Sequence, residues 1–228
     1  MKKSIFLSFI LCLCLVACIP QQAMAQKQSR MEKLLRYLND NDADKWQKNR
    51  EKLDDETKAY YAEDLSLMDV LNDLWNGQSE QAATLYFGCY EKAAQNNFPS
   101  ICEGEKIPLS QIRDKADQSI INLLEASKDK IPFSRALLDS IHATEYPVDS
   151  AMLQRLQNIR EVALLEGMLK APTPIIYQTY VKEYPNGKFI AQVNASENVR
   201  LYQLVKTTPT PANFKANRVS CSGTSGLP

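Results

Sequence analysis

Four acidic residues near the start of the chain have the spacing of a calcium-binding loop. Positions 1, 3, 5 and 12 of an EF-hand supply the carboxylate oxygens, and here those positions are Asp40, Asp42, Asp44 and Glu51. Position 6, which is glycine in such loops, is Lys45. The alternative is a polar turn whose acidic residues stabilise the N-terminus of the next helix. We therefore expect no bound metal or other cofactor. If a metal does bind, these four residues are the candidate ligands.

Cysteine and histidine offer little for catalysis. Cys89 and Cys102 are close in sequence, with Cys102 in a predicted loop over residues 100–108, so an oxidising compartment would let them form a disulfide. The alternative is two free thiols packed as small apolar groups. Neither cysteine lies in a motif that activates a nucleophile, and His142 is the single histidine. We predict no catalytic residue and no enzymatic activity.

Two short sequences resemble the Asp-Ser/Thr-apolar acceptor of periplasmic O-glycosylation in some Gram-negative bacteria. They are DSI at 139–141 and DSA at 149–151, so Ser140 and Ser150 are the candidate modified residues. Asp149 has a second explanation, because aspartate is a favoured N-cap and an apolar-periodic segment follows it.

Residues 1–25 have the layout of a secretory signal peptide. Two lysines precede an apolar run over residues 5–16, which is too short to span a bilayer, and the small residues Ala23 and Ala25 suit cleavage by signal peptidase. Alternatively, the stretch LVAC that ends at Cys18 resembles the lipobox of bacterial lipoproteins, in which Cys18 would carry the lipid. The predicted location is the periplasm, and the alternative is an outer-membrane lipoprotein.

The charge balance of the chain argues against nucleic acid as a partner. The sequence has 27 Lys and Arg residues, of which residues 1–25 hold two, and 27 Asp and Glu residues. Such a balance gives no electrostatic attraction to nucleic acid or to an anionic membrane. We expect membrane contact only through the candidate lipid anchor.

Apolar residues recur at helical spacing between prolines and glycines, which predicts an all-α fold. No window alternates apolar and polar residues as a strand would. Residues 26–130 form the predicted N-terminal helical region. One face of its first helix consists of Met31, Leu34, Leu35 and Leu38.

From residue 131 onward, short sequences that contain proline recur at a regular spacing. EYP at 145–147 recurs as EYP at 183–185, and PTP at 172–174 recurs as PTP at 209–211, with offsets of 38 and 37 residues. Two interleaved matches at nearly one period predict a helix-turn-helix array over residues 131–216, whose units must stack to bury their apolar faces.

The best-defined unit of this array begins at Thr173. Thr173 is a suitable N-cap and Pro174 a suitable first helical residue. Gly187, in the turn after this helix, is expected to adopt a positive φ. A second helix follows, in which Ala191 and Ala195 are small enough for its partner helix to approach closely. Its larger apolar residues are Ile190, Val193, Val199, Leu201 and Leu204.

The segment YVKEYPNGKFIA, residues 180–191, resembles the tetratricopeptide-like repeats of bacterial envelope proteins such as outer-membrane assembly lipoproteins and Tol-Pal-associated coordinators. Their units often read tyrosine, spacer, tyrosine-proline, small residue, aromatic, alanine. The resemblance extends over residues 131–216. It implies a tetratricopeptide-like C-terminal half that acts as a protein-interaction or assembly scaffold, with an unidentified envelope protein as its partner.

Two polar residues are the candidates for binding that partner. Gln178 and Lys182 fall on the side of their helix opposite Tyr177 and Tyr184. The alternative function is a lipid-anchored accessory protein that binds a small ligand or a glycan. Aromatic residues could line a groove for a partner, although such spacing also fits a helical core: Tyr60, Tyr61, Trp75, Tyr177, Tyr180, Tyr184 and Tyr202.

The last twelve residues break the pattern. NRVSCSGTSGLP, residues 217–228, has no periodicity and cannot complete a helix pair. We expect an irregular tail, produced by truncation or by an altered reading frame.

Overall fold

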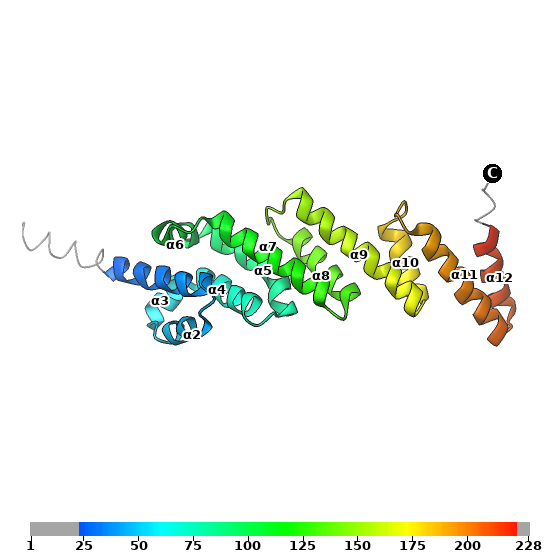
Figure 1. Ribbon diagram of the computed structural model, residues 1–228, viewed down its shortest axis with the longest axis horizontal. Coiled ribbons are helices and arrows are strands. Elements are labelled where there is room, and N and C mark those ends of the chain that lie inside the picture. Colours follow the sequence, from blue (N-terminus) through cyan, green and yellow to red (C-terminus); the bar gives the residue numbers. More distant parts are fainter. Residues whose placement is uncertain (1–22, 223–228) are drawn as a thin grey trace, which may run out of the picture. The chain divides into compact units, whose positions relative to one another are not determined.

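The computed structural model describes residues 23–222, with side chains as far as residue 217, and this part of the chain is helical without a strand, as predicted (Figure 1). The first helix covers described residues 23–39. The later helices are α2 (Ala43–Glu51), α3 (Asp55–Tyr60), α4 (Ala62–Trp75), α5 (Glu80–Gln95), α6 (Phe98–Glu105), α7 (Leu109–Ala126), α8 (Lys130–Ala143), α9 (Ser150–Lys170), α10 (Pro174–Glu183), α11 (Ile190–Thr207) and α12 (Pro211–Ser222).

Two predictions about the N-terminus fall on residues 1–22, which lie outside the described part of the chain: most of the signal peptide and the lipobox residue Cys18. Within residues 23–222, no helix combines the length and the apolar character needed to cross a membrane.

The described chain divides into two compact units. Unit 1 comprises residues 23–123 and Asp139–Pro147, and unit 2 comprises Leu124–Leu138 and residues 148–222. Helices α7 and α8 each contribute residues to both units. Each unit has its own buried side chains, and the two are described separately.

Side-chain caps fix where several helices begin. In each case an Asp, Ser or Thr oxygen accepts a hydrogen bond from the backbone N–H three residues later, which satisfies a donor that the helix itself leaves unpaired. Both caps predicted from the sequence, Asp149 and Thr173, are confirmed. The residues that cap a helix in this way include Asp42, Asp54, Ser79, Asp149, Thr173 and Thr210.

An aromatic cluster lies in the core of unit 1. Tyr86, Phe87 and Tyr90 of α5 surround the ring of Tyr146, with centroids 4.8–5.5 Å apart. The hydroxyl of Tyr146 donates to the carboxylate of Asp117 in α7. Burial raises the pKa of Tyr146 well above its usual range, so this hydroxyl stays protonated and keeps donating. The segment after α8 is thereby held against α5 and α7.

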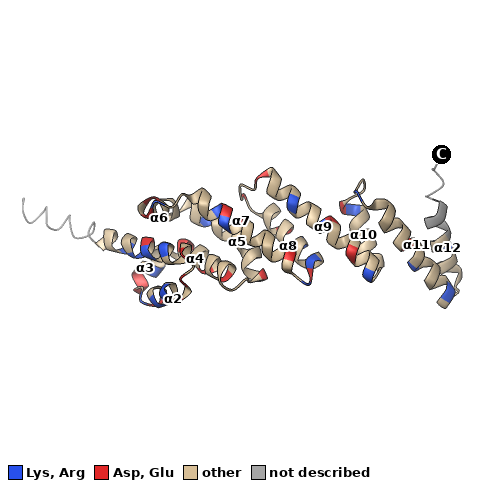
Figure 2. Ribbon diagram, viewed as in Figure 1, with Lys and Arg blue, Asp and Glu red and all other residues tan. Residues whose placement is uncertain are grey.

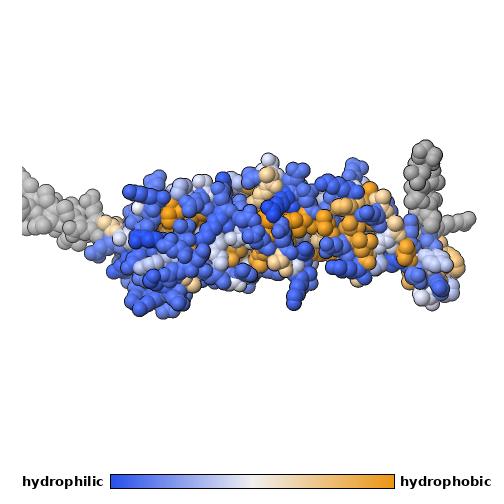
Figure 3. Space-filling view, in the orientation of Figure 1, coloured by the Kyte–Doolittle hydropathy of each residue, from blue (hydrophilic) through white to orange (hydrophobic). Residues whose placement is uncertain are grey.

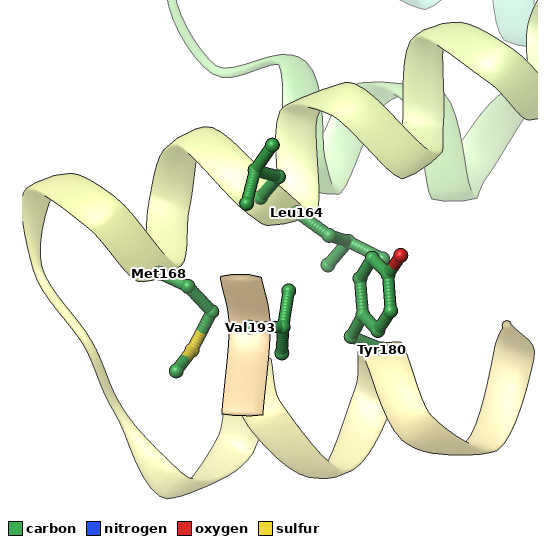
Figure 4. Close-up of a cluster of buried hydrophobic side chains, with 5 residues drawn as sticks. Leu164, Met168, Tyr180 and Val193 are labelled. Atoms are coloured by element: carbon green, nitrogen blue, oxygen red, sulfur yellow. The ribbon is translucent and has the colours of Figure 1, made fainter. Parts of the chain in front are cut away.

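Unit 2 is built from stacked helices around a small apolar core (Figure 4). Leu164 and Met168 of α9, Tyr180 of α10 and Val193 of α11 converge on it and are completely buried. Three helices therefore share one set of contacts, which is the stacking that a helix-turn-helix array requires.

A buried ion pair fixes α10 against its neighbours. Arg160 of α9 is only 2 % exposed, and its Nη2 donates to Glu183 Oε1 of α10 at 3.0 Å. Its Nη1 donates to the carbonyl oxygen of Ile131 at 2.8 Å and to Ser134 Oγ at 3.3 Å, both on α8. Burial alone would raise the pKa of Glu183, but Arg160, helped by Arg135, outweighs that effect and lowers it. One guanidinium thus joins three helices.

The turn after α10 requires a glycine, but for a different reason from the predicted one. No described glycine has a positive φ, so the predicted left-handed conformation of Gly187 is wrong. Instead, a Cβ at Gly187 would lie 2.5 Å from the hydroxyl of Tyr180 and would also collide with the carboxylate of Glu161. The Tyr180 hydroxyl donates to Glu161 Oε1 at 2.8 Å and accepts from the N–H of Phe189 at 3.1 Å. Close approach, not backbone freedom, selects the glycine.

The two PTP sequences begin equivalent helices. Thr173 Oγ1 accepts from the N–H of Ile176 before α10, and Thr210 Oγ1 accepts from the N–H of Asn213 before α12, both at 3.2 Å. The repeat read from the sequence is therefore a repeated helix start. Helix α12 continues to Ser222, so the irregular tail predicted from residue 217 is wrong for residues 217–222, and residues 223–228 lie outside the described chain.

We expect Arg160→Ala to lower the free energy of unfolding of unit 2 by about 3 kcal/mol, because it removes packing and leaves Glu183 short of its main partner. Urea unfolding followed by circular dichroism would measure the change. Arg155→Ala is the matched control, since the Arg155–Glu125 pair is half exposed and should contribute less than about 1 kcal/mol. Equal losses in both variants would contradict the role given to Arg160.

Candidate interaction surface

The four acidic metal candidates do not form a calcium loop. Helix α2 begins within it, and Asp42 is the N-cap, accepting from the Lys45 N–H at 3.1 Å and pairing with the Lys45 ammonium at 2.7 Å. Asp44 lies in the first turn of α2, and Glu51 accepts from Gln47 within the same helix. The interpretation of Asp40, Asp42, Asp44 and Glu51 as metal ligands is therefore wrong, and the alternative of acidic residues at a helix N-terminus is confirmed. No cluster of three or more His, Cys, Asp or Glu in the described chain is placed to hold a metal ion.

The predicted disulfide is also not formed. Cys89 and Cys102 carry free thiols. Cys102 belongs to α6 and not to a loop, and it points into the core of unit 1, whereas Cys89 lies 3.5 Å from the hydroxyl of Ser66. Burial, reinforced by the nearby Asp64, raises the pKa of Cys102 to about 12. That shift disfavours the thiolate, which is the form a nucleophile needs.

A buried carboxyl group accompanies this thiol. Asp64 is completely buried in α4, and its Oδ2 accepts from Asn96 Nδ2 at 3.2 Å, while the Phe98 N–H also donates to the carboxyl group. Its Oδ1 has no partner. Burial raises the pKa of Asp64 to about 7 despite these two donors. The interior of unit 1 therefore contains a group that titrates near neutral pH.

The two candidate glycosylation sites differ in accessibility. The Ser140 hydroxyl donates to the carbonyl oxygen of Thr84 at 2.7 Å, so it is engaged inside unit 1. Ser150 is exposed at the first residue of α9. Of the two, Ser150 is the more exposed, because Ser140 is partly buried.

Exposed apolar side chains concentrate on unit 2. Of the eight large hydrophobic residues that are exposed in the described chain, two, Tyr60 and Leu85, belong to unit 1. Hydrophobic surface gathers over α9 and α10 on the face drawn in Figure 3. The six residues on unit 2 are Val162, Leu169, Ile175, Val199, Tyr202 and Phe214.

Helix α10 presents one exposed stripe. Ile175 is 75 % exposed, and Gln178 and Lys182 follow it at positions i+3 and i+7 on the same face. The buried residue Tyr180 lies on the opposite face and packs on α9. The two sequence-predicted partner-binding residues, Gln178 and Lys182, are thus brought together with an apolar residue that the sequence analysis did not select.

Helix α11 presents a second stripe, opposite its buried residues Val193 and Leu201. Val199 belongs to this stripe, and its side chain is 60 % exposed. Its separation from Val193 is six residues and from Leu201 two, and neither spacing keeps residues on one helical face. This spacing is the feature of the sequence that indicates an exposed Val199. The exposed stripe consists of Ala191, Ala195, Val199, Tyr202 and Lys206.

The two stripes together, residues 175, 178 and 182 of α10 and 191, 195, 199, 202 and 206 of α11, are called the outer face. The sequence of residues 174–222 holds six Lys and Arg residues and two glutamates. Figure 2 colours the charged residues of α10 and α11 among them. Both glutamates are neutralised by arginine, Glu183 by Arg160 and Glu197 by Arg200 at 2.7 Å. Lys182 and Lys206 form no ion pair with the described residues. The outer face therefore combines apolar side chains with unpaired positive charge.

Comparison of the chain with protein-family models, with curated proteins and with solved structures gives no match. The chemistry of the outer face and of the unit 1 interior is consequently the basis for assigning a function.

The buried Asp64 predicts how stability depends on pH. Its pKa in the folded protein, about 7, lies above the ordinary value of 3.8, so its contribution to stability is complete in acid and is lost as the pH rises through 7. We expect the free energy of unfolding to fall between pH 5 and pH 8, by up to about 2.5 kcal/mol from this group. Asp64→Asn should largely remove that fall, and urea titrations at both pH values measure it. If the exposed-site control Asp55→Asn removed it equally, Asp64 would not be the cause.

Proposed function

We propose that the protein is a non-enzymatic scaffold that binds another protein through the outer face of its stacked helical hairpins. The observation that carries this proposal is the concentration of exposed apolar side chains on unit 2, of which Ile175, Val199 and Tyr202 lie on the outer face. Lys182 and Lys206, which form no ion pair with the described residues, lie on the same face. Apolar residues clustered at a surface mark interaction sites, whereas scattered ones need no explanation. The tetratricopeptide-like resemblance of residues 131–216 supports the same function, since such arrays bind partners along their helical faces.

We further propose that this scaffold acts in the periplasm, after removal of residues 1–25, with an outer-membrane lipoprotein anchored at Cys18 as the alternative form. The signal-like sequence and the lipobox-like LVAC support these two locations. The envelope location would make another envelope protein the partner.

Affinity capture from envelope extracts tests the scaffold function. The full-length protein should recover a specific partner, and the double variant Val199→Asp, Tyr202→Asp should lose it, because two carboxylates would replace the exposed apolar contacts. Leu85→Asp is the matched control, since Leu85 is similarly exposed but belongs to unit 1. Circular dichroism should show both proteins folded. Failure to recover any specific partner, or equal loss in the control, would refute the proposal.

A second candidate function, glycan or small-ligand binding, is favoured by a pocket in unit 1. A cavity of about 410 Å³ is lined by an exposed tyrosine, Tyr60, together with amide and hydroxyl side chains. Met24 and Ala25 also line it, so this second function goes with the form anchored at Cys18, which retains both residues. An aromatic ring beside a few polar groups suits an amphipathic ligand such as a sugar. The polar lining residues are Gln28, Asn97 and Ser100.

If this pocket binds glycans, Tyr60→Ala should weaken binding to a panel of oligosaccharides about tenfold or more, measured by calorimetry. Tyr202→Ala removes another exposed tyrosine, this one from unit 2, and should leave binding unchanged. Absence of binding by the unaltered protein across the panel would eliminate this second function.

A further inference from the structure

The proposed scaffold function leaves the chemistry of the partner open, and the outer face restricts it. Resting on that function, we propose that the outer face binds an acidic amphipathic helix of another protein, with apolar side chains at its centre and carboxylates toward both ends.

The first argument is that the two stripes have the same design. On α10, the apolar Ile175 is followed by Gln178 at i+3 and by Lys182 at i+7. On α11, the apolar Val199 is followed by Tyr202 at i+3 and by Lys206 at i+7. Residues at these spacings share one side of a helix. Each stripe therefore begins with an exposed apolar residue and ends in an unpaired lysine.

The second argument is the order of these residues along the face. Helices α10 and α11 form an antiparallel hairpin, in which Tyr177 donates to Asn194 at 3.2 Å (Figure 1). This register sets the start of α10 beside the middle of α11. The lysines at the two helix C-termini, Lys182 and Lys206, consequently fall at opposite ends of the outer face. The apolar residues Ile175 and Val199 lie between them.

The third argument is shape. Ala191 and Ala195 are exposed on α11 in line with Val199, and such small side chains let a second helix approach the backbone closely. From residue 191 to residue 206, the α11 stripe spans roughly 22 Å at 1.5 Å per residue. A partner helix of about 15 residues would cover that length, with apolar positions at i, i+3, i+4 and i+7.

Charge selects an acidic partner. Neither glutamate of residues 174–222 is available to a ligand, because arginines hold both. Carboxylates on the partner would meet Lys182 and Lys206 without repulsion, which favours acidic over basic helices.

Two other occupants fit the outer face less well. A lipid surface is recognised by clusters of about four to eight basic residues, whereas this face has two lysines and a central glutamine. A second copy that paired through its own outer face would bring lysines against lysines, and one that paired through unit 1 would need an exposed apolar stripe there. There, the two exposed large hydrophobic residues of the described chain, Tyr60 and Leu85, lie on different helices.

Photocrosslinking in native cells identifies what covers the face. Tyr202→p-benzoylphenylalanine places the crosslinker on the outer face, and Gln154→p-benzoylphenylalanine, exposed on α9 outside it, is the control. Mass spectrometry of the product should identify a segment of another protein that is rich in Asp and Glu and has apolar residues at helical spacing. Crosslinks from position 202 to lipid, to a second copy, or to a basic segment would overturn the proposal. No protein crosslink at position 202 would overturn the scaffold function as well.

A charge-reversal experiment with a synthetic peptide of the crosslinked segment tests the electrostatic part separately. The double variant Lys182→Glu, Lys206→Glu should bind the peptide at least tenfold more weakly, and Lys128→Glu, an exposed lysine outside the face, should bind it normally. A peptide whose terminal carboxylates are replaced by lysine should recover binding to the double variant. Unchanged affinity of the double variant would overturn the acidic-helix inference while leaving the scaffold function standing.

Discussion

The arrangement of unit 2 depends on one constraint, which is that the guanidinium of Arg160 is buried and must be fully hydrogen-bonded. Removing a charge from water costs several kcal/mol unless partners of suitable geometry replace the water. Those partners come from α8 and α10, namely the Ile131 carbonyl, the Ser134 hydroxyl and the Glu183 carboxylate. The position of Glu183 sets the rotation of α10 about its own axis. That rotation decides which residues of α10 face solvent.

The outer face follows from this rotation. With Glu183 turned toward Arg160 and Tyr180 turned into the apolar core, Ile175, Gln178 and Lys182 remain on the opposite side. Tyr180 extends the same constraint into the next turn, because its hydroxyl bonds the Phe189 N–H and Glu161 and leaves room only for glycine at position 187. That turn directs α11 back along α10 and aligns the two lysine-terminated stripes. The interior of the hairpin thus determines the chemistry of its surface.

The sequence predicts where the helices lie better than it predicts which side of each helix is buried. The caps at Asp149 and Thr173 and the PTP repeat are local signals, since they depend on hydrogen bonds within a few residues, and they mark the helix starts correctly. The burial of Arg160 and the need for glycine at position 187 depend on residues 20 or more positions away along the chain, or on side chains of another helix. No local sequence pattern predicts them. The exposure of Val199 is partly predictable, because its separation of six residues from Val193 places the two residues on different sides of a helix.

Two local patterns in the sequence were each compatible with two physical outcomes. The acidic residues around Asp42 satisfy an EF-hand spacing, but Lys45 stabilises the Asp42 carboxylate inside a helix start, so the helix forms instead of the loop. Cys89 and Cys102 are near in sequence, yet α5 and α6 point them at different neighbours. In both cases the helix that contains the residue decides its partner.

The central claim, that the outer face is where a partner binds, is tested most directly by amide hydrogen exchange with and without the captured partner. The account predicts that the partner slows exchange in α10 and α11, over residues 174–207, and leaves α4 and α5 of unit 1 unchanged. Protection confined to unit 1, with exchange in α10 and α11 unaltered, would contradict it.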